Sequence, residues 1–161
     1  YFDFAGYSLL AMGLGYMMGI AVPANFNKPY LAENPQDFWK RWHITLGDWL
    51  RDYFFRPIYK SLSSYKSLKN WPLLKQNVAL FSTFALMGCW NGFETKYIVS
   101  GAVFGFYSLV HNSFVYYSKK NGKNIFDALP GWLSRSISIF IMVNLACFAI
   151  YLFSGRFPYF N

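Results

Sequence analysis

Two histidines, His43 and His111, are the side chains in this sequence best suited to proton transfer near neutral pH. His43 ends the dense run FWKRWH at residues 38–43, in which neighbouring cations could hold an anionic group. Because it lies four residues after Trp39, on a helix it would stand at the border of an apolar face, half removed from water. This position suits either proton chemistry or a plain interfacial residue that is hydrogen-bonded to a headgroup or a carbonyl.

His111 lies deep inside an apolar run, where an ionisable group is costly and is by default a candidate for function. A neutral histidine with one hydrogen bond between helices explains the same position, and we favour that interpretation. Asp3 stands at the start of another apolar run, where it could bond to helix backbone or to a helix upstream. Cys89 and Cys147 lack the spacing of a metal site, and the sequence has no glycine-rich phosphate loop or Ser-His-Asp order.

The composition indicates a membrane as the surroundings of these residues. Of 161 residues, 55% are hydrophobic and 23% aromatic, with a mean hydropathy of +0.18, which exceeds the usual composition of a soluble domain. The net charge of +8 could suggest nucleic acid, but the basic residues lie between apolar runs instead of lining one surface. We therefore predict a protein that contacts membrane lipids and no nucleic acid.

Four apolar runs predict membrane helices and, with them, an all-α polytopic fold in one membrane-embedded unit over residues 1–161. The runs are residues 5–22, 78–90, 97–117 and 137–153. Pro23 is expected to end the first of them. The run 78–90 is shorter than the roughly 20 residues of a full span, so it is either a tilted short span or a re-entrant helix. Because the sequence opens at Tyr1 directly on an apolar stretch, we expect the natural chain to continue upstream with further helices.

An amphipathic helix of interfacial type is predicted over residues 35–56. Asn34 and Pro35 form a favourable N-cap and first position, and apolar residues then recur three and four apart. Two pairs of opposite charge, four residues apart, lie on the other side: Asp37 with Arg41, and Asp52 with Arg56. Such a helix lies in the headgroup zone with its tryptophans inward, until Pro57 interrupts it.

The basic residues near the helix ends predict an orientation in the cell membrane. If 78–90 and 97–117 form a hairpin, the basic loops 28–75 and 119–135 fall on the same side, which is expected to be cytoplasmic. The turn at Asn91 then faces away from the cytoplasm. These loops predict a multi-pass protein.

One stretch is specific enough to indicate a family. Residues 38–46 (FWKRWHITL) and 49–53 (WLRDY) closely resemble the FW-x-RWH-x-(S/T)-L…W-x-RD block of bacterial membrane-bound O-acyltransferases, which include alginate O-acetyltransferases. Shorter matches lie at residues 2–8, 25–29, 97–99 and 153–155. Together they favour the branch that transfers D-alanine, known as DltB, and they cover nearly the whole sequence.

The resemblance implies transfer of D-alanine from a phosphopantetheine thioester on an acyl carrier protein toward lipoteichoic acid, a cell-wall modification of Gram-positive bacteria. The family holds its acyl-transfer site in a tunnel through the membrane domain. His43 matches the first of two family histidines, with a supporting or catalytic role. Lys40, Arg41 and Arg51 are then candidates for contacting the carrier or its phosphopantetheine phosphate, because a basic face suits an acidic carrier. The resemblance implies no bound cofactor and no metal.

The sequence departs from the family at the second histidine. The family motif is G-x-WHG, whereas residues 88–92 are GCWNG, so Asn91 stands in the place of that histidine. Asparagine cannot accept a proton at neutral pH, but it can donate a hydrogen bond to an oxyanion.

Several functions are compatible with this departure. The chain could belong to an active D-alanyl transferase in which His43 or an upstream group moves the proton and Asn91 positions the acyl group. It could also belong to a catalytically impaired homologue that binds the carrier as a scaffold, or to a transport protein that keeps the tunnel. A polysaccharide O-acetyltransferase of the same family is a further alternative. We favour the active D-alanyl transferase.

Overall fold

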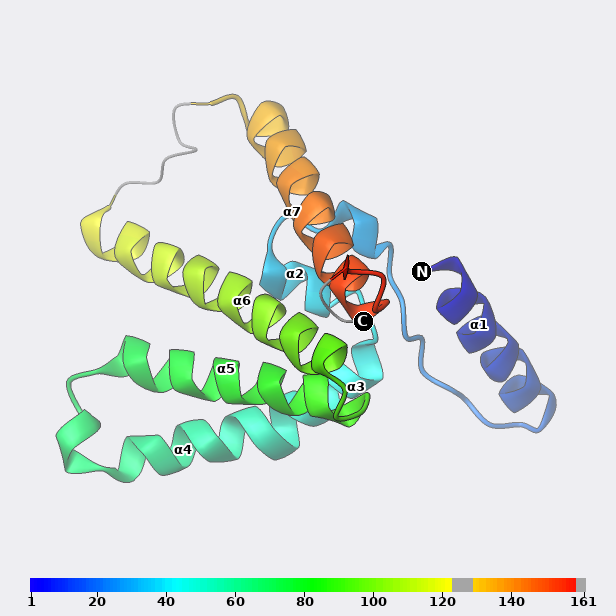
Figure 1. Ribbon diagram of the computed structural model, residues 1–161, viewed down its shortest axis with the longest axis horizontal. Helices are drawn as coiled ribbons and strands as arrows, with labels where there is room; N and C mark the ends of the chain where they lie inside the picture. The colour runs from blue at the N-terminus through cyan, green and yellow to red at the C-terminus, as the bar shows by residue number, and fades with distance from the viewer. Residues whose placement is uncertain (123–128, 159–161) are drawn as a thin grey trace.

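The computed structural model describes residues 1–122 and 129–158, and its regular structure is helical (Figure 1). The α-helices are α1 (Phe2–Met17), α2 (Pro35–Trp39), α3 (Ile44–Leu50), α4 (Arg56–Ser64), α5 (Pro72–Trp90), α6 (Thr95–Asn121) and α7 (Gly131–Phe153). Short 3-10 turns lie at Pro29–Leu31 (η1) and Lys66–Leu68 (η3), and a π-helical turn, Arg51–Phe55 (η2), joins α3 to α4. The described residues form no sheet, and the prediction of an all-α fold is confirmed.

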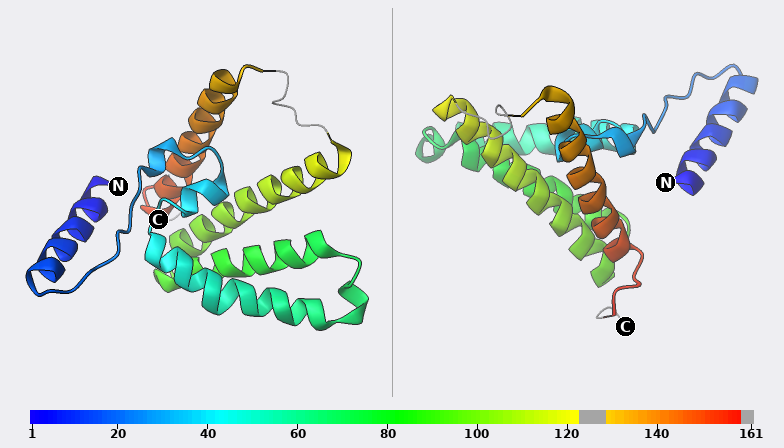
Figure 2. Two further views of the ribbon diagram at one scale, coloured as in Figure 1. Left: turned by 180° about the vertical axis from the view of Figure 1, so that it is seen from behind. Right: turned by 90° about the horizontal axis from the view of Figure 1, so that it is seen from above.

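Helices α5 and α6 form an antiparallel hairpin, and α7 meets α6 near the start of α6 (Figures 1 and 2). The Ser100 hydroxyl donates a hydrogen bond to the carbonyl of Ala149 at 2.9 Å, and the rings of Tyr97 and Phe153 are 4.9 Å apart. Large buried side chains fill the space between these helices and α2: Phe38, Phe84, Met87, Phe104 and Met142. The hairpin, α7 and α2 therefore share one core.

Two glycines determine how closely α5 and α6 approach. A Cβ atom at Gly101 would lie 2.7 Å from the carbonyl oxygen of Phe84 and 2.9 Å from the Cα of Gly88. A Cβ atom at Gly88 would lie 2.7 Å from the carbonyl oxygen of Tyr97. Because the obstructing atoms belong to the backbone, small residues are required here, as they are where membrane helices pack tightly. This contact brings the turn at Asn91 against α6.

Helices α6 and α7 are long and apolar enough to cross a membrane. Helix α6 contains the predicted run 97–117 and extends beyond it at both ends, and α7 begins six residues before the predicted run 137–153. Gly122 ends α6 in the left-handed conformation, after two lysines in the last turn. Positive charges there interact favourably with the negative end of the helix dipole.

Helix α1 ends earlier than the predicted run 5–22. Gly19 adopts a φ of +75°, and the N–H of Ile20 donates a hydrogen bond to the carbonyl of Gly15 at 2.8 Å. This Schellman arrangement stops the helix well before Pro23, the residue that was expected to end it. An extended segment then leads away, so that α1 stands to one side of the other helices (Figure 2).

Helix α5 begins at Pro72, six residues before the predicted run 78–90. Proline is favourable at a first helical position because its missing N–H has no partner there in any helix. Lys75 and Asn77, two polar residues near the start of α5, pack against other helices. Lys75 is buried with its ammonium 5.9 Å from the ring centre of Tyr59, and Asn77 hydrogen-bonds to two side chains of α6.

The prediction of one amphipathic helix over residues 35–56 is wrong, because the helix is broken at residues 40–43. His43 has a φ of +45°, in the left-handed region. The backbone around it pairs with residues 25–27 instead of continuing the helix. Two hydrogen bonds make this pairing, from the N–H of Asn27 to the carbonyl of Arg41 at 2.9 Å and from the N–H of Ile44 to the carbonyl of Asn25 at 3.0 Å. They satisfy backbone groups that a continuous helix would have used.

Beyond the break, the helix continues past Pro57, although we predicted that it would end there. Helices α3, η2 and α4 run without interruption from Ile44 to Ser64. The π-helical turn shifts the hydrogen-bonding pattern directly before Pro57, so a residue without an N–H is accommodated.

The predicted N-cap and the two predicted ion pairs of residues 34–56 are confirmed. The side-chain oxygen of Asn34 accepts a hydrogen bond from the N–H of Asp37 at 2.8 Å, which is the predicted N-cap. Both predicted ion pairs form, Arg41 with Asp37 at 2.9 Å and Arg56 with Asp52 at 2.8 Å. These contacts span a single helical turn, so the break at residues 40–43 does not prevent them.

Candidate functional site

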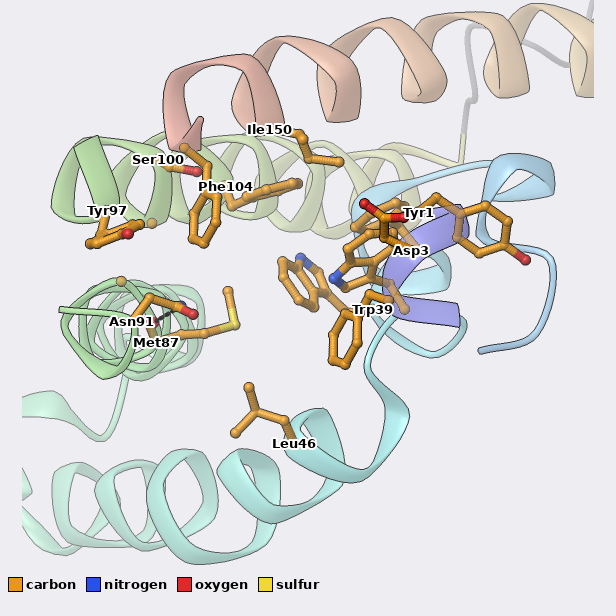
Figure 3. A pocket seen from close by; sticks show the side chains of 16 residues that line it. Tyr1, Asp3, Trp39, Leu46, Met87, Asn91, Tyr97, Ser100, Phe104 and Ile150 are labelled. Carbon is orange, nitrogen blue, oxygen red and sulfur yellow. Dashed lines mark hydrogen bonds between the residues drawn. The ribbon is translucent and has the colours of Figure 1, made fainter. Parts of the chain in front are cut away.

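A cavity of about 350 Å³ lies where α1, α2, α3, α5, α6 and α7 meet (Figure 3). Its wall is largely aromatic and carries few polar groups, which is typical of sites that bind small molecules. The lining residues are Tyr1, Asp3, Phe4, Phe38, Trp39, Trp42, Leu46, Met87, Gly88, Asn91, Tyr97, Ser100, Gly101, Phe104, Ile150 and Phe153. Segments far apart in the sequence therefore build one site.

Asn91 lies on the cavity wall at the C-terminal end of α5. One N–H of its side-chain amide donates a hydrogen bond to the carbonyl of Met87 at 3.0 Å, which fixes the side chain. A primary amide has a second N–H and an oxygen with two lone pairs, and both remain available to a ligand. Asn91 can therefore orient a bound group but cannot take up a proton.

Asp3 and Tyr1 lie on the opposite side of the cavity from Asn91 (Figure 3). Asp3 is the one carboxylate among the described residues of the wall, so it can accept a proton from a bound hydroxyl. Sequence reasoning placed Asp3 at a helix start and missed its position in this cavity. The sequence gives little indication of this position, because the first turn of α1 contacts Phe26, Trp42 and His43 only in the folded chain.

Trp39, the last residue of α2, is a second wall residue that sequence reasoning missed. It was assigned to the apolar face of a helix on the basis of spacing alone. In the structure its indole Nε1 is buried and has no hydrogen-bond partner among the described residues. A buried donor of this kind is uncommon, because most buried polar groups in proteins are paired.

His43 is absent from the described cavity wall and lies just behind it. Its ring meets the ring of Phe4, a wall residue, edge to face at a centroid distance of 4.9 Å. Its Nδ1 is buried without a hydrogen-bond partner among residues 1–122 and 129–158. Burial lowers the pKa of His43 below its ordinary value, so the neutral imidazole is favoured at pH 7. The structure thus separates His43 from Asn91, and Asn91 alone reaches the cavity.

His43 is expected to titrate below pH 6.5, its ordinary pKa, because burial disfavours the imidazolium. As the pH falls through 6.5, the unfolded chain takes up a proton that the folded chain does not, so acidification lowers the free energy of unfolding. The titration can be followed by NMR of histidine-labelled full-length protein, with the resonance assigned by its loss in His43→Gln. A midpoint above 6.5 would contradict the effect of burial.

The three predicted carrier-binding cations differ in their surroundings. Lys40 is exposed and has no ion-pair partner in the described part of the chain. Arg41 pairs with Asp37 at 2.9 Å and fixes the turn after α2. Arg51 lies within 2.6 Å of Asp48 and 3.0 Å of Asp52, and the hydrogen bond that its guanidinium donates to Asp52 raises the pKa of Arg51. Lys40 is therefore the cation whose charge is least compensated.

His111 lies on α6, roughly 24 Å along the helix from Thr95, and is not among the described lining residues. The nearby polar side chains bond to one another: Asn112 donates a hydrogen bond to Asn77 at 2.7 Å, and Asn77 donates one to Ser113 at 3.1 Å. No three histidine, cysteine, aspartate or glutamate side chains in the described ranges are placed to hold a metal ion.

Comparison with known proteins agrees with this architecture. The family model described as "MBOAT, membrane-bound O-acyltransferase family" matches residues 1–154. The chain is 38% identical over 158 residues to the "Teichoic acid D-alanyltransferase" of Bacillus subtilis (strain 168), a match that covers 97% of this chain and 38% of the relative. The protein of the same name from Streptococcus thermophilus is 34% identical, with 96% of this chain and 38% of the relative covered.

A second group of relatives is named for another activity. The "Probable alginate O-acetylase AlgI" of Pseudomonas aeruginosa is 40% identical over 114 residues, a match that covers 70% of this chain and 20% of that protein. The chain thus spans about 38% of the length of the D-alanyltransferases and a smaller share of the acetylase.

Proposed function

This chain belongs to the membrane-bound O-acyltransferase family, and on that premise we propose that its protein transfers D-alanine from a carrier-protein thioester to teichoic acid. The observation that carries the proposal is the extent of the similarity. The match to the D-alanyltransferases runs through 97% and 96% of the chain, whereas the match to the alginate acetylase covers 70%. A larger share of the chain is thus similar to the D-alanyl transferases than to the alginate acetylase.

The aromatic cavity supports acyl transfer chemically. A hydroxyl oxygen of the acceptor attacks the thioester carbonyl, the carbon–sulfur bond breaks, and the hydroxyl proton leaves through a base to the departing thiolate. An apolar wall limits competing hydrolysis because it keeps water from the thioester, and it strengthens the remaining polar contacts. Few polar groups are needed if each is placed correctly.

Asn91, Asp3 and His43 have different roles in the proposed transfer. Asn91 orients the acyl group through its free N–H and its oxygen, because its other N–H is held by Met87. Asp3 faces the same space and is suited to receive the hydroxyl proton. His43 has a supporting role, since its neutral ring backs Phe4 on the wall; an upstream group is the alternative proton acceptor.

We further propose that Lys40, with Arg41 and Arg51, attracts an acidic carrier protein or its phosphopantetheine phosphate. Lys40 contributes most because its charge has no described partner, whereas both arginines are paired with aspartates. Exposed charges of this kind accelerate encounter more than they tighten a complex. The attraction should therefore weaken as salt is added.

The protein is proposed to be multi-pass, with its lysine-rich end in the cytoplasm. The connection between α4 and α5 and the last turn of α6 lie at the same end of the molecule, opposite the turn at Asn91 (Figure 1). These two segments contain four lysines, namely Lys66, Lys69, Lys119 and Lys120. Such clusters concentrate on the cytoplasmic side of membranes.

The test uses the full-length protein in vesicles with lipoteichoic acid as acceptor and carrier protein loaded with radioactive D-alanine. Transfer of label to the polymer is expected, with a KM for the carrier that rises with salt. Carrier loaded with acetate serves as the matched donor. Preferential acetyl transfer would favour the polysaccharide acetylase, and binding of the carrier without any transfer would favour the impaired homologue.

A further inference from the structure

We infer that the indole N–H of Trp39 donates a hydrogen bond to the carbonyl oxygen of the acyl group held in the cavity. The inference rests on the proposed function, since it names a binding residue within the same site. It does not depend on which acyl group is carried, because acetyl and D-alanyl groups both contain this carbonyl.

The first argument is the unpaired donor. Nε1 of Trp39 is buried, has no hydrogen-bond partner among the described residues, and belongs to a side chain on the cavity wall. Indole nitrogen can only donate, so the partner that it lacks must be an acceptor. A carbonyl oxygen entering the cavity provides one, and pairing removes the unfavourable state of a buried donor without an acceptor.

The second argument is rigidity. The Trp39 ring packs against Phe104, edge to face, with centroids 5.0 Å apart, and against Phe84 at 5.4 Å. A further edge contact with Phe38 has a centroid distance of 5.4 Å. These rings come from α2, α5 and α6 and hold the indole from three sides. A donor that is fixed before the reaction stabilises developing negative charge without reorganising.

The third argument is the position of Trp39 relative to the other polar groups. In Figure 3, Trp39 lies between the side of the cavity formed by Asn91 and the side formed by Asp3. A carbonyl bound between Trp39 and Asn91 receives N–H groups from two directions. The attacking hydroxyl can then approach from the side of Asp3, which is suited to accept its proton.

A spectroscopic experiment tests the hydrogen bond without requiring turnover. Full-length protein labelled with ¹⁵N-tryptophan is titrated with pantetheine that carries D-alanine through an amide, which cannot be transferred. The indole proton of Trp39, assigned by its loss in Trp39→Phe, should shift downfield on binding. The comparison probe has a methylene group in place of the carbonyl, and it should not produce this shift. The indole of Trp132, exposed on α7, serves as the internal control.

A kinetic experiment tests the same bond in the reaction. Trp39→Phe keeps the aromatic packing and removes the donor, so kcat should fall by about 10²–10³-fold, as for other donors to an oxyanion. The KM for the carrier should stay near its wild-type value, because the carrier binds elsewhere. Trp132→Phe loses an indole outside the cavity and should retain wild-type kcat.

The outcomes separate the inference from the proposed function. If wild-type protein transfers acetate instead of D-alanine, the function is wrong, and the Trp39 shift is then expected with pantetheine that carries acetate through an amide. If the amide probe of the acyl group that is transferred fails to bind, if it and its methylene counterpart shift Trp39 equally, or if Trp39→Phe keeps full kcat, the inference is overturned. Should Trp39→Phe fail to fold, the wild-type response to the two probes decides alone, with the resonance assigned by Trp39→Tyr.

Discussion

Replacing Asn91 by alanine is expected to lower kcat for D-alanyl transfer by about 10²–10³-fold, the loss seen when one oxyanion donor is removed from other enzymes. Asn91 reaches the cavity at the end of α5, and its free N–H is the group that alanine cannot replace. The KM for the carrier should change little, because Asn91 is expected to act on the acyl group during transfer. Steady-state transfer in vesicles measures both constants.

Asn144→Ala is the matched control for this substitution. Asn144 donates a side-chain hydrogen bond to the carbonyl of Phe140 at 2.8 Å, one turn back on α7, just as Asn91 does to Met87. It is exposed and absent from the described cavity wall, so its loss should leave kcat unchanged. Equal effects of the two substitutions would remove Asn91 from the chemistry. Inactive wild type with recovered transfer in Asn91→His would instead indicate that the site has decayed.

Gly101→Val is expected to abolish the folded protein, and Gly101→Ala to destabilise it by about 1–3 kcal/mol, the usual cost of overpacking. A Cβ atom at this position would lie 2.7 Å from the carbonyl oxygen of Phe84 and 2.9 Å from the Cα of Gly88. A rotamer change cannot relieve this clash because both atoms are backbone. Thermal unfolding in detergent, followed by size-exclusion chromatography, measures the loss.

Gly131→Ala controls for the general effect of adding a methyl group to a helical glycine. A Cβ atom at Gly131 has no atom within 4 Å, and alanine is the better helix former. This variant should unfold at or slightly above the wild-type temperature. A Gly101→Ala protein as stable as Gly131→Ala would show that α5 and α6 can separate without cost.

Local patterns in the sequence were sufficient where an interaction spans one helical turn. The Asn34 cap and the Asp37–Arg41 pair each connect residues three or four apart, so spacing alone predicts them. The left-handed His43 has no such signal. Its conformation depends on backbone pairing with residues 25–27, and nothing in the sequence around His43 encodes that contact.

Burial of polar residues explains the error at the start of α5. We placed Lys75 in the basic loop 28–75 and began the apolar run after Asn77, because lysine and asparagine are usually exposed. In the fold Lys75 packs on Tyr59 of α4, and Asn77 bonds to Asn112 and a neighbouring serine on α6. Partners on other helices therefore decide where this helix begins.

The candidate site could be predicted only in part for the same reason. Asn91 was found because it replaces a motif histidine, and that inference needed no structure. Trp39 looked like one more apolar residue on a helix face, and Asp3 like a carboxylate at a helix start. Their shared cavity requires six helices to come together, and neither the spacing nor the motif describes this arrangement.

If α5 crosses the membrane, as the short-span alternative for residues 78–90 predicts, the polar residues at its two ends have a consequence for the lipid around it. From Lys75 to Asn91 the helix rises roughly 24 Å at 1.5 Å per residue, whereas a typical hydrocarbon core is about 30 Å thick. When the apolar length of a protein is shorter than the hydrocarbon core of the membrane, the membrane becomes thinner around the protein. The two aqueous compartments would then lie closest together beside the cavity. A flexible thioester arm from one compartment and a polymer end from the other would each have less distance to cover.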